Sequence, residues 1–399
     1  MKKNSGKIGV WLIGVYGDIA TTLIVGNCAI QNGLVSNTGL VTSLEPMREL
    51  GLCGFDDLVI GGHDIISSTV SKQAEIVCER SRTFSYALLK QVSPQLEQID
   101  ADCQLAPDLH WEPNRANEDL QSLDDLCKKF RHLLRTFADK YELDHVVVVN
   151  IASAETFISL INAHDDIDEF VSLIEQDRKD LVAPSMLYAY AAFMESYSYL
   201  NFTPNIGASV GALQKLANQK RVPFYGNDGK TGETLVKTAL APMFAARHLK
   251  VMSWEGTNLL GNGDGRTLSV PENCKNKIQN KGAALPQILG YPVHAGVDIN
   301  YVPSLGDWKT AWDLIHFQGF LDVPMTMQFT WQGCDSILAA PLVLDMVRLM
   351  EFAYRKGEHG ALHHLACFFK NPIEVEEHNF HKQFQMLIDY TAKHLVQNQ

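Results

Sequence analysis

The sequence lacks several features that would place it in other classes of protein. No stretch reaches the roughly 20 consecutive apolar residues that span a bilayer, so we expect no membrane partner. No basic block offsets the formal net charge of −12, which argues against a nucleic-acid partner. The eight cysteines form no CxxC pair, so we expect reduced thiols in a cytoplasmic protein. Internal repeats and low-complexity tracts are also missing.

The remaining composition is that of a folded enzyme. With 399 residues, of which 46% are hydrophobic, the chain is long enough for two domains, because single cores rarely exceed about 250–300 residues. An acidic protein that binds a phosphate ester must place lysine, arginine or helix N-termini locally against its overall charge. The positions of individual lysines are therefore informative.

The first half of the chain predicts an α/β fold. Residues 120–137 place apolar side chains at steps of three and four, which indicates an amphipathic helix. Apolar runs without polar alternation suit a parallel sheet that is covered on both faces. The expected strands are Ile8–Ile13, Leu58–Gly62, His145–Asn150, Tyr199–Phe202 and Pro223–Tyr225.

From about residue 237 the pattern changes. The expected strands His248–Trp254, Val293–Val302 and Met325–Trp331 alternate more between polar and apolar residues. This alternation predicts a second sheet with an exposed or interfacial face. Asp335–Tyr354 and Phe380–Leu395 are expected to form helices that close the chain.

A glycine turn follows the first expected strand. Gly14 and Gly17 lie directly before a helical pattern, where glycine lets backbone N–H groups approach a pyrophosphate. The spacing is GxxGxxA and not GxGxxG, so a plain tight turn is the alternative. Asp64 ends the second strand and could accept ribose hydroxyls, in which case residues 34–57 form an insertion.

Two polar loops offer further candidates. Residues 226–233 read Gly-Asn-Asp-Gly-Lys-Thr-Gly-Glu and precede an expected helix that begins near Thr231. This charged loop suits a sugar or a nicotinamide, with an N-capped turn as the alternative. Asn258–Arg266 is a second polar, glycine-rich loop.

The lysines of the second half fall into two kinds. Lys277 and Lys281 stand four apart and would share a helix face, which suits either an anion between them or a solvated surface. Lys309 and Lys370 are lone cations beside large apolar residues. Partly buried lysines of this kind can polarise a carbonyl group or transfer a proton.

Two other patterns point to different chemistry. Gly207–Gly211 fits GxSxG, but Pro204 and Asn205 intrude and no histidine is placed to pair with the serine. His359 and His363 have metal-compatible spacing without a third ligand, so we predict no metal site there.

Taken together, the motifs resemble one enzyme family, the myo-inositol-1-phosphate synthases (inositol-3-phosphate synthases), in their archaeal and bacterial forms. The order, spacing and content of five segments carry the resemblance, which covers essentially the whole chain. These segments are Gly226–Glu233, Ser253–Arg266, Asp298–Phe320, Met325–Leu344 and Phe368–Pro372. The resemblance implies a Rossmann-like NAD-binding domain, residues 1–236 and 338–399, with an inserted α+β catalytic and oligomerisation domain, residues 237–337.

The resemblance also implies an activity. In this family, NAD takes a hydride from C5 of open-chain glucose 6-phosphate, C6 then attacks the C1 aldehyde, and re-reduction gives 1D-myo-inositol 3-phosphate. The cofactor is regenerated in each turnover. The family is usually tetrameric, so we expect a homotetramer, and the sequence leaves open whether a monovalent or divalent cation is needed.

Carried over residue by residue, the resemblance implies a site. The implied catalytic residues are Lys277, Lys281, Lys309, Lys370, Asp228, Asp264, Asp335 and Asn258. The implied cofactor-binding residues are Gly14, Tyr16, Gly17, Asp18, Ile19, Asp64, Ser153, Ser185, Asn227, Asp228 and Lys230. We expect Lys309 and Lys370 at the C5 and C1 oxygens, and Lys277 and Lys281 at the phosphate and the enolate.

Two other functions remain compatible with the motifs. A dehydrogenase of the homoserine or aspartate-semialdehyde kind would use the same NAD domain but would release NADH. A non-catalytic NAD sensor would bind the cofactor, yet it would have no reason to place four lysines around a sugar site.

Overall fold

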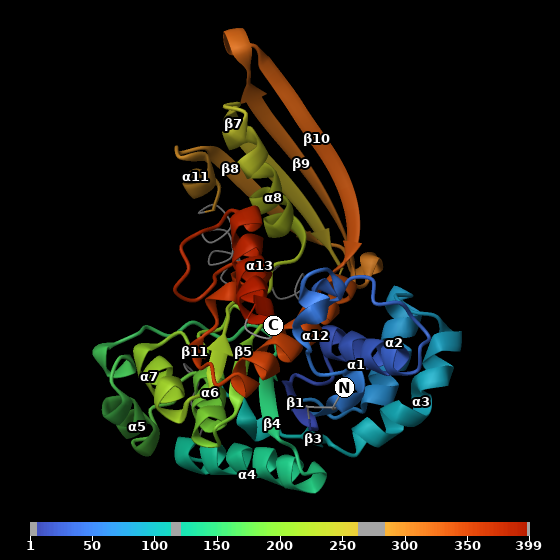
Figure 1. Cartoon of the computed structure of the whole chain (residues 1–399), viewed down its shortest axis with the longest axis vertical. Helices are drawn as coiled ribbons and strands as arrows, with labels where there is room; N and C mark the ends of the chain where they lie inside the picture. Colours follow the sequence, from blue (N-terminus) through green and yellow to red (C-terminus); the bar gives the residue numbers. More distant parts are fainter. Residues whose placement is uncertain (1–5, 113–120, 262–283, 397–399) are drawn as a thin grey trace.

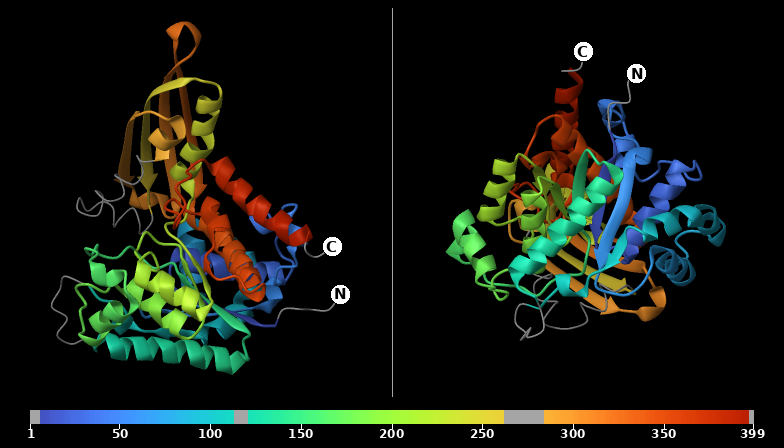
Figure 2. Two further views of the ribbon diagram at one scale, coloured as in Figure 1. Left: turned by 60° about the vertical axis from the view of Figure 1, so that its left-hand side comes forward. Right: turned by 90° about the horizontal axis from the view of Figure 1, so that it is seen from below.

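The computed structural model of the chain describes residues 6–112, 121–261 and 284–396. Two β-sheets organise these residues: a parallel sheet of seven strands and a mixed sheet of four, which stands on one end of the first (Figures 1 and 2). Each sheet has its own hydrophobic core. The predicted α/β class and the predicted second sheet are both confirmed.

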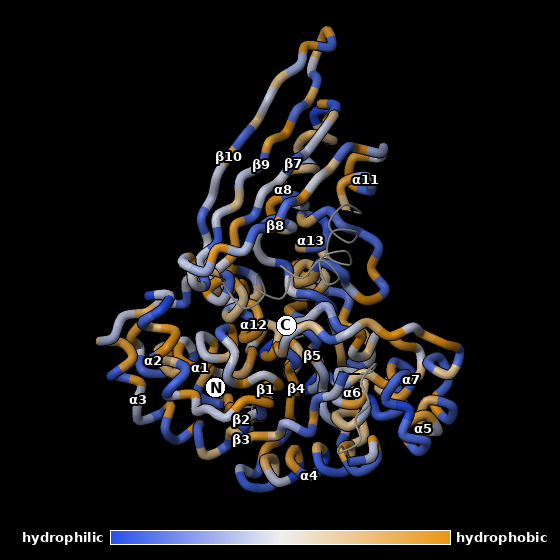
Figure 3. Tube along the Cα trace, turned by 180° about the vertical axis from the view of Figure 1, so that it is seen from behind, coloured by the Kyte–Doolittle hydropathy of each residue, from blue (hydrophilic) through white to orange (hydrophobic). Residues whose placement is uncertain are grey.

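The seven parallel strands lie in the order β11-β6-β5-β4-β1-β2-β3. They are β1 (Ile8–Ile13), β2 (Leu58–Asp64), β3 (Cys103–Leu105), β4 (His145–Asn150), β5 (Ser198–Asn201), β6 (Pro223–Tyr225) and β11 (Gly360–Ala361). Every residue of β1 and of β4 is buried, and the four central residues of β4 are all valine. The hydropathy view in Figure 3 shows the interior of this layer largely in orange. From β3 to β6 the order is that of a Rossmann fold, with the topological switch between β1 and β4.

Helices cover both faces of this sheet (Figure 1). They are α1 (Asp18–Gln31), α2 (Val70–Ser81), α3 (Tyr86–Asp100), α4 (Leu123–Tyr141), α5 (Ile167–Glu175), α6 (Pro184–Met194), α7 (Gly211–Lys220), α12 (Asp335–Arg355) and α13 (Phe380–Val396). Helix α4 buries Phe130, Leu134 and Phe137, as the periodicity predicts. Helix α12 packs along α1, and Leu387 of α13 is also buried in the first core, so both ends of the chain belong to that core.

Short 3₁₀ helices connect the larger elements. They are η1 (Val41–Ser43), η2 (Met47–Leu50), η3 (Phe55–Asp57), η4 (Pro107–Leu109), η5 (Asn162–His164), η6 (Pro303–Leu305), η7 (Phe320–Asp322) and η8 (His363–Phe368). The first three occupy the predicted insertion, residues 34–57. The buried Asp345 of α12 fixes it by accepting hydrogen bonds from the backbone N–H of Val41 (2.5 Å) and of Thr42 (3.2 Å). Burial raises the pKa of Asp345 to about 6.

The four-stranded sheet has the order β10-β9-β7-β8. Its strands are β7 (Lys250–Leu260), β8 (His294–Tyr301), β9 (Trp308–Gln318) and β10 (Pro324–Cys334). Helices α8 (Gly232–Ala246) and α11 (Ala284–Leu289) cover one face, around a core that includes Phe244 and Trp254. Burial along β9 alternates, which is the expected behaviour of a sheet with one open face.

Strand β9 was not among the predicted strands, and the prediction of three strands was incomplete. Its inward side carries the buried charged residues Lys309 and Asp313 beside Ala311 and Ile315. The inward positions therefore do not form an apolar series in the sequence. Asn258 also lies within β7 and not in the predicted loop.

The sequence predicts reduced cysteines and no membrane-spanning segment. The seven cysteines within the described residues are free thiols. None of the described helices has the length and apolar character needed to cross a membrane. The domain boundaries near residues 237 and 337 stay a prediction.

Candidate active site

A cleft of about 400 Å³ lies at the carboxyl ends of β1 and β4, facing the four-stranded sheet. In open α/β sheets this switch point is where ligands bind. The loops after β1, β4 and β6 contribute to the cleft, as do β7, β9 and the first turn of α12. Among the described residues that line it are Gly17, Asp18, Ile19, Arg80, Ser153, Asp228, Glu233, Asn258, Asp307, Lys309, Asp335 and Lys370.

The turn after β1 needs its glycines. Gly14 has a φ of 88°, and a Cβ there would lie 2.9 Å from the Cα of Ala152 in the loop after β4. Gly17 is the N-cap of α1 and has no side chain to accept from the first N–H groups of the helix. Gly17, Asp18 and Ile19 line the cleft, so this helix N-terminus faces it, and the contact with a pyrophosphate stays a prediction.

Asp64 closes the same turn from β2. Its Oδ2 accepts a hydrogen bond from the backbone N–H of Tyr16 at 2.9 Å, and its Oδ1 accepts one from Ile65 at 2.7 Å. Burial raises the pKa of the Tyr16 phenol to about 12, with the charges of Cys103, Asp100 and Asp64 adding to the shift. The carboxylate is thus fixed beside the turn, and its contact with a ribose stays a prediction.

The loop after β4 is held by a partly buried carboxyl group. The two oxygens of Glu155 accept from the backbone N–H of Ser185 (2.8 Å) and from its hydroxyl (2.7 Å), at the N-terminus of α6. Burial raises the pKa of Glu155 to about 7, although the Ser185 hydrogen bonds lower it. Ser153, two residues earlier, lines the cleft, whereas Ser185 is not among the lining residues.

One lysine–carboxylate pair comes from the second sheet. Lys309 Nζ lies 2.5 Å from Asp335 Oδ1 and 5.4 Å from the centre of the Trp331 ring. Asp335 is the first residue of α12, and Asp307 fixes this helix end by accepting from the backbone N–H of Ser336 at 3.1 Å. Burial raises the pKa of Asp307. A buried ammonium group is therefore held at the cleft wall with its charge balanced.

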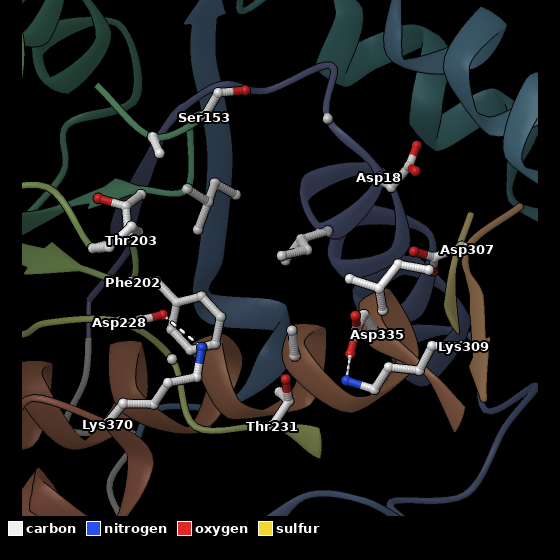
Figure 4. Close-up of a pocket in the computed structure, with 18 of the residues that line it drawn as sticks. Asp18, Ser153, Phe202, Thr203, Asp228, Thr231, Asp307, Lys309, Asp335 and Lys370 are labelled. Carbon is white, nitrogen blue, oxygen red and sulfur yellow. Dashed lines mark hydrogen bonds and ion pairs between the residues drawn. The ribbon is translucent and has the colours of Figure 1, made fainter. Parts of the chain in front are cut away.

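A second pair lies across the cleft. Lys370 Nζ is 2.7 Å from Asp228 Oδ1, and the backbone N–H of Lys370 also donates to the carbonyl of Asp228 at 2.7 Å. Asp228 has a φ of 62°, a left-handed conformation that aspartate tolerates better than most residues. Figure 4 shows this pair on one side of the cleft, and Lys309 with Asp335 on the other, the same side as Asp18 and Asp307.

A buried polar chain extends from the cleft into the second sheet. Asn258 Nδ2 donates to Glu233 Oε2 at 2.7 Å, and Lys237 Nζ lies 2.5 Å from Glu233 Oε1. All three residues are buried. Lys237 therefore balances the charge of Glu233 one helical turn away on α8.

The other predicted site residues do not line the cleft, or they are not among the residues that the structure describes. The ammonium of Lys230 donates to Gln383 of α13, and burial lowers the pKa of Lys230 to about 8. The Asn227 amide donates to Ser209. These side chains do not line the cleft, and neither do Gly14, Tyr16, Asp64 or Ser185. Lys277, Lys281 and Asp264 lie outside the described residues.

Sequence reasoning missed three charged residues of the cleft. Glu233 is the last residue of the motif at 226–233, and Asp307 lies two residues before Lys309. Their position in or beside these motifs could have identified them. Arg80, near the end of α2, had no such signal.

No cluster of three or more metal-ligating side chains occurs in the described part of the chain. His363, which has metal-compatible spacing to His359, lies 2.9 Å from Glu374 instead.

Comparison with known proteins agrees with this geometry. Residues 8–391 match the sequence profile of the myo-inositol-1-phosphate synthase family. The chain is 34% identical to inositol-3-phosphate synthase 1 of Bacteroides thetaiotaomicron, over 95% of this chain and 92% of that one. It is 29% identical to the inositol-3-phosphate synthase of Dictyostelium discoideum, over 88% and 75% of the two chains.

A solved structure agrees at the level of the fold. The crystal structure of inositol-3-phosphate synthase from Caenorhabditis elegans superposes with a TM-score of 0.85 at 24% identity, covering 98% of this chain and 86% of that one. The match covers 92% of the bacterial relative and 75% of the Dictyostelium protein, which agrees with the predicted resemblance to the archaeal and bacterial forms of the family. The chain belongs to the myo-inositol-1-phosphate synthase family.

Proposed function

We propose that the protein is an inositol-3-phosphate synthase, which closes D-glucose 6-phosphate into 1D-myo-inositol 3-phosphate without net oxidation. The main support is one observation. Two lysine–carboxylate pairs, Lys309–Asp335 and Lys370–Asp228, face a single cleft that also opens onto the glycine turn before α1. A site that only bound NAD would not need both pairs.

The chain's own groups suit the electrostatic part of this chemistry. When bound, NAD supplies the acceptor and later the donor of a hydride. The sugar passes through forms with negative charge on an oxygen, and a fixed ammonium group stabilises such a charge best in a site shielded from water. Lys309 and Lys370 would each donate to one such oxygen, at C5 and at C1.

The carboxylates of the two pairs would handle protons. Asp335 and Asp228 accept hydrogen bonds from the Nζ atoms of Lys309 and Lys370. Each pair can therefore take up the proton of a sugar hydroxyl when the carbonyl forms and return a proton when the carbonyl is reduced. Asn258, held by Glu233, would orient the substrate, and Lys277 and Lys281 would serve the phosphate and the enolate.

The function is tested with purified protein and a substoichiometric amount of NAD. Inositol phosphate should accumulate to many equivalents of the NAD supplied. Formation of NADH in step with substrate loss would favour a dehydrogenase instead. Binding of NAD without turnover of glucose 6-phosphate would favour a sensor.

We also propose a cytoplasmic homotetramer that assembles through the four-stranded sheet. The hairpin between β9 and β10 projects from the molecule, and Phe320 and Leu321 at its tip are 88% and 78% exposed. Exposed apolar groups of this size mark contact surfaces. Light scattering should give a tetramer for the wild type and smaller species for Phe320→Ser/Leu321→Ser, and a monomeric wild type would contradict the proposal.

A further inference from the structure

The cleft has more acidic than basic side chains among the described residues. Five acids line it, namely Asp18, Asp228, Glu233, Asp307 and Asp335. Three bases line it, namely Arg80, Lys309 and Lys370. The two lysines are already paired with carboxylates at 2.5 and 2.7 Å. Glu233 is paired with Lys237, so among the described residues Asp18 and Asp307 are the lining acids whose charge an anionic cofactor would still meet unless it is offset.

Asp18 is the acid at the critical position. It is the first residue of α1, directly after Gly17, and it lines the cleft. A carboxylate in the first turn stabilises the helix itself, because it faces the positive end of the helix dipole. The same carboxylate repels a pyrophosphate that would bind at this helix end. Its charge must be offset for the dinucleotide to bind there.

Arg80 supplies that charge. Its guanidinium donates to Asp18 Oδ2 at 2.6 Å from the last turn of α2. The two side chains are 43% and 24% exposed, so the pair contributes little to folding. Its importance lies in its position at the cleft.

The end of α2 is fixed by contacts with the second sheet. The Ser81 carbonyl accepts from Trp308 Nε1 at 2.7 Å, and the Ser81 hydroxyl accepts from the backbone N–H of Asp307 at 3.3 Å. Trp308 directly precedes Lys309. Arg80 is thus held between the dinucleotide turn and the strand that carries Lys309.

We propose that Arg80 is a positioning residue for the cofactor. By pairing with Asp18, it removes the negative charge at the N-terminus of α1 and lets this helix end accept the NAD pyrophosphate. The inference rests on the proposed function, because it takes NAD as the ligand of this turn. It adds a role for a residue to which no sequence motif pointed.

The test is a double-mutant cycle read by calorimetric titration with NAD. Arg80→Met should weaken NAD binding about tenfold, a typical effect for one unbalanced charge near a phosphate. Asp18→Asn should bind NAD at least as tightly as the wild type. The double variant should return to within about threefold of the wild type, because the charge to be balanced is gone.

Controls separate charge balance from other roles of Arg80. Arg80→Lys should retain most of the affinity, and Arg82→Met, an exposed neighbour outside the cleft, should retain all of it. Binding of adenosine, which has no phosphate, should not change in any variant. The loss in Arg80→Met should shrink in about 1 M salt, where charges are screened within about 3 Å.

Two results for the Arg80 variants would overturn the proposal. Unchanged NAD affinity in Arg80→Met overturns the proposal. A double variant that binds NAD as weakly as Arg80→Met also overturns it, because Arg80 would then contact the phosphates itself. If thermal melts show that Arg80→Met does not fold, Asp18→Asn is the deciding variant. Weaker NAD binding by Asp18→Asn than by the wild type overturns the proposal. A wild type that does not bind NAD would refute the proposed function instead, before any variant is compared.

Discussion

The two sheets of this protein bury their strands in different ways. In the parallel sheet every residue of β1 and β4 is buried, and the binding groups lie in turns beyond the strand ends. In the four-stranded sheet the burial of β9 alternates, and buried polar side chains such as Lys309 and Asn258 project from the strands themselves. The first sheet thus carries its cleft residues, Lys370 and Asp228 among them, in the turns and helices around it, whereas the second sheet presents Lys309 and Asn258 from the strands themselves.

This division predicts that charged residues at the cleft affect turnover more than folding. Replacing Lys309 or Lys370 with Met keeps the stem and removes the ammonium group. Each variant should lose about 10²–10³ in turnover, the usual effect of removing one oxyanion donor. Steady-state kinetics, NAD titration and thermal melts would be measured together.

Lys250→Met is the matched control, because Lys250 is an exposed lysine at the far end of β7 in the same sheet. It should turn over normally. Near-native turnover in either cleft variant would remove that lysine from the chemistry.

The free energy of unfolding should depend more on the buried strands of the parallel sheet than on the exposed face of the four-stranded sheet. Leu12→Ala in the fully buried β1 should lower the free energy of unfolding by about 2–5 kcal/mol, because it leaves a cavity between two helix layers. Thr330→Ser on the exposed side of β10 should change it by less than about 0.5 kcal/mol. Urea unfolding followed by circular dichroism gives both values. Equal changes in the free energy of unfolding for the two variants would contradict the difference between the two sheets.

Cofactor affinity should depend on the first sheet. Asp64→Ala should weaken NAD binding by about 1–3 kcal/mol, the cost of losing charged hydrogen bonds to the ribose and to the turn. Asp56→Ala, an exposed acid just before β2, is the control and should bind normally. Calorimetric titration measures both. An unchanged dissociation constant in Asp64→Ala would exclude a role for this residue in the site.

The loop after β4 should make stability depend on pH. Burial raises the pKa of Glu155 from its ordinary 4.5 to about 7, so the folded state favours the protonated carboxyl. That stabilisation is complete below pH 4.5 and is lost as the pH rises through about 7. Melting temperatures should therefore fall across this range in the wild type and less so in Glu155→Gln. Parallel curves for the two proteins would contradict the prediction.

The elements that could be predicted are those with a simple periodicity. The bounds of β1, β4 and β6 match the sequence prediction, and α12 and α13 agree to within one residue at each end. Strand β9 could not be predicted, because a buried Lys309 and a buried Asp313 occupy its inward positions. These residues are satisfied only by partners that other elements contribute, which no local pattern contains.

Four of the residues that the sequence predicts for the site line the cleft, but the sequence did not predict how they pair. The motifs named Lys309, Asp335, Lys370 and Asp228 as members of one site. They did not reveal that Lys309 pairs with Asp335 across 26 positions of the chain, or Lys370 with Asp228 across 142.

The sequence by itself determined five of the seven strands of the parallel sheet, the glycine turn and the chemical types of several residues that line the cleft. These features depend on local backbone conformation and on runs of apolar residues, which neighbouring positions encode. Only the tertiary structure decided which lysine balances which acid, and placed Arg80 beside Asp18, 62 positions away. The physical reason is that a charge is balanced by groups near it in space, and the packing of two sheets on α12 brings those groups together.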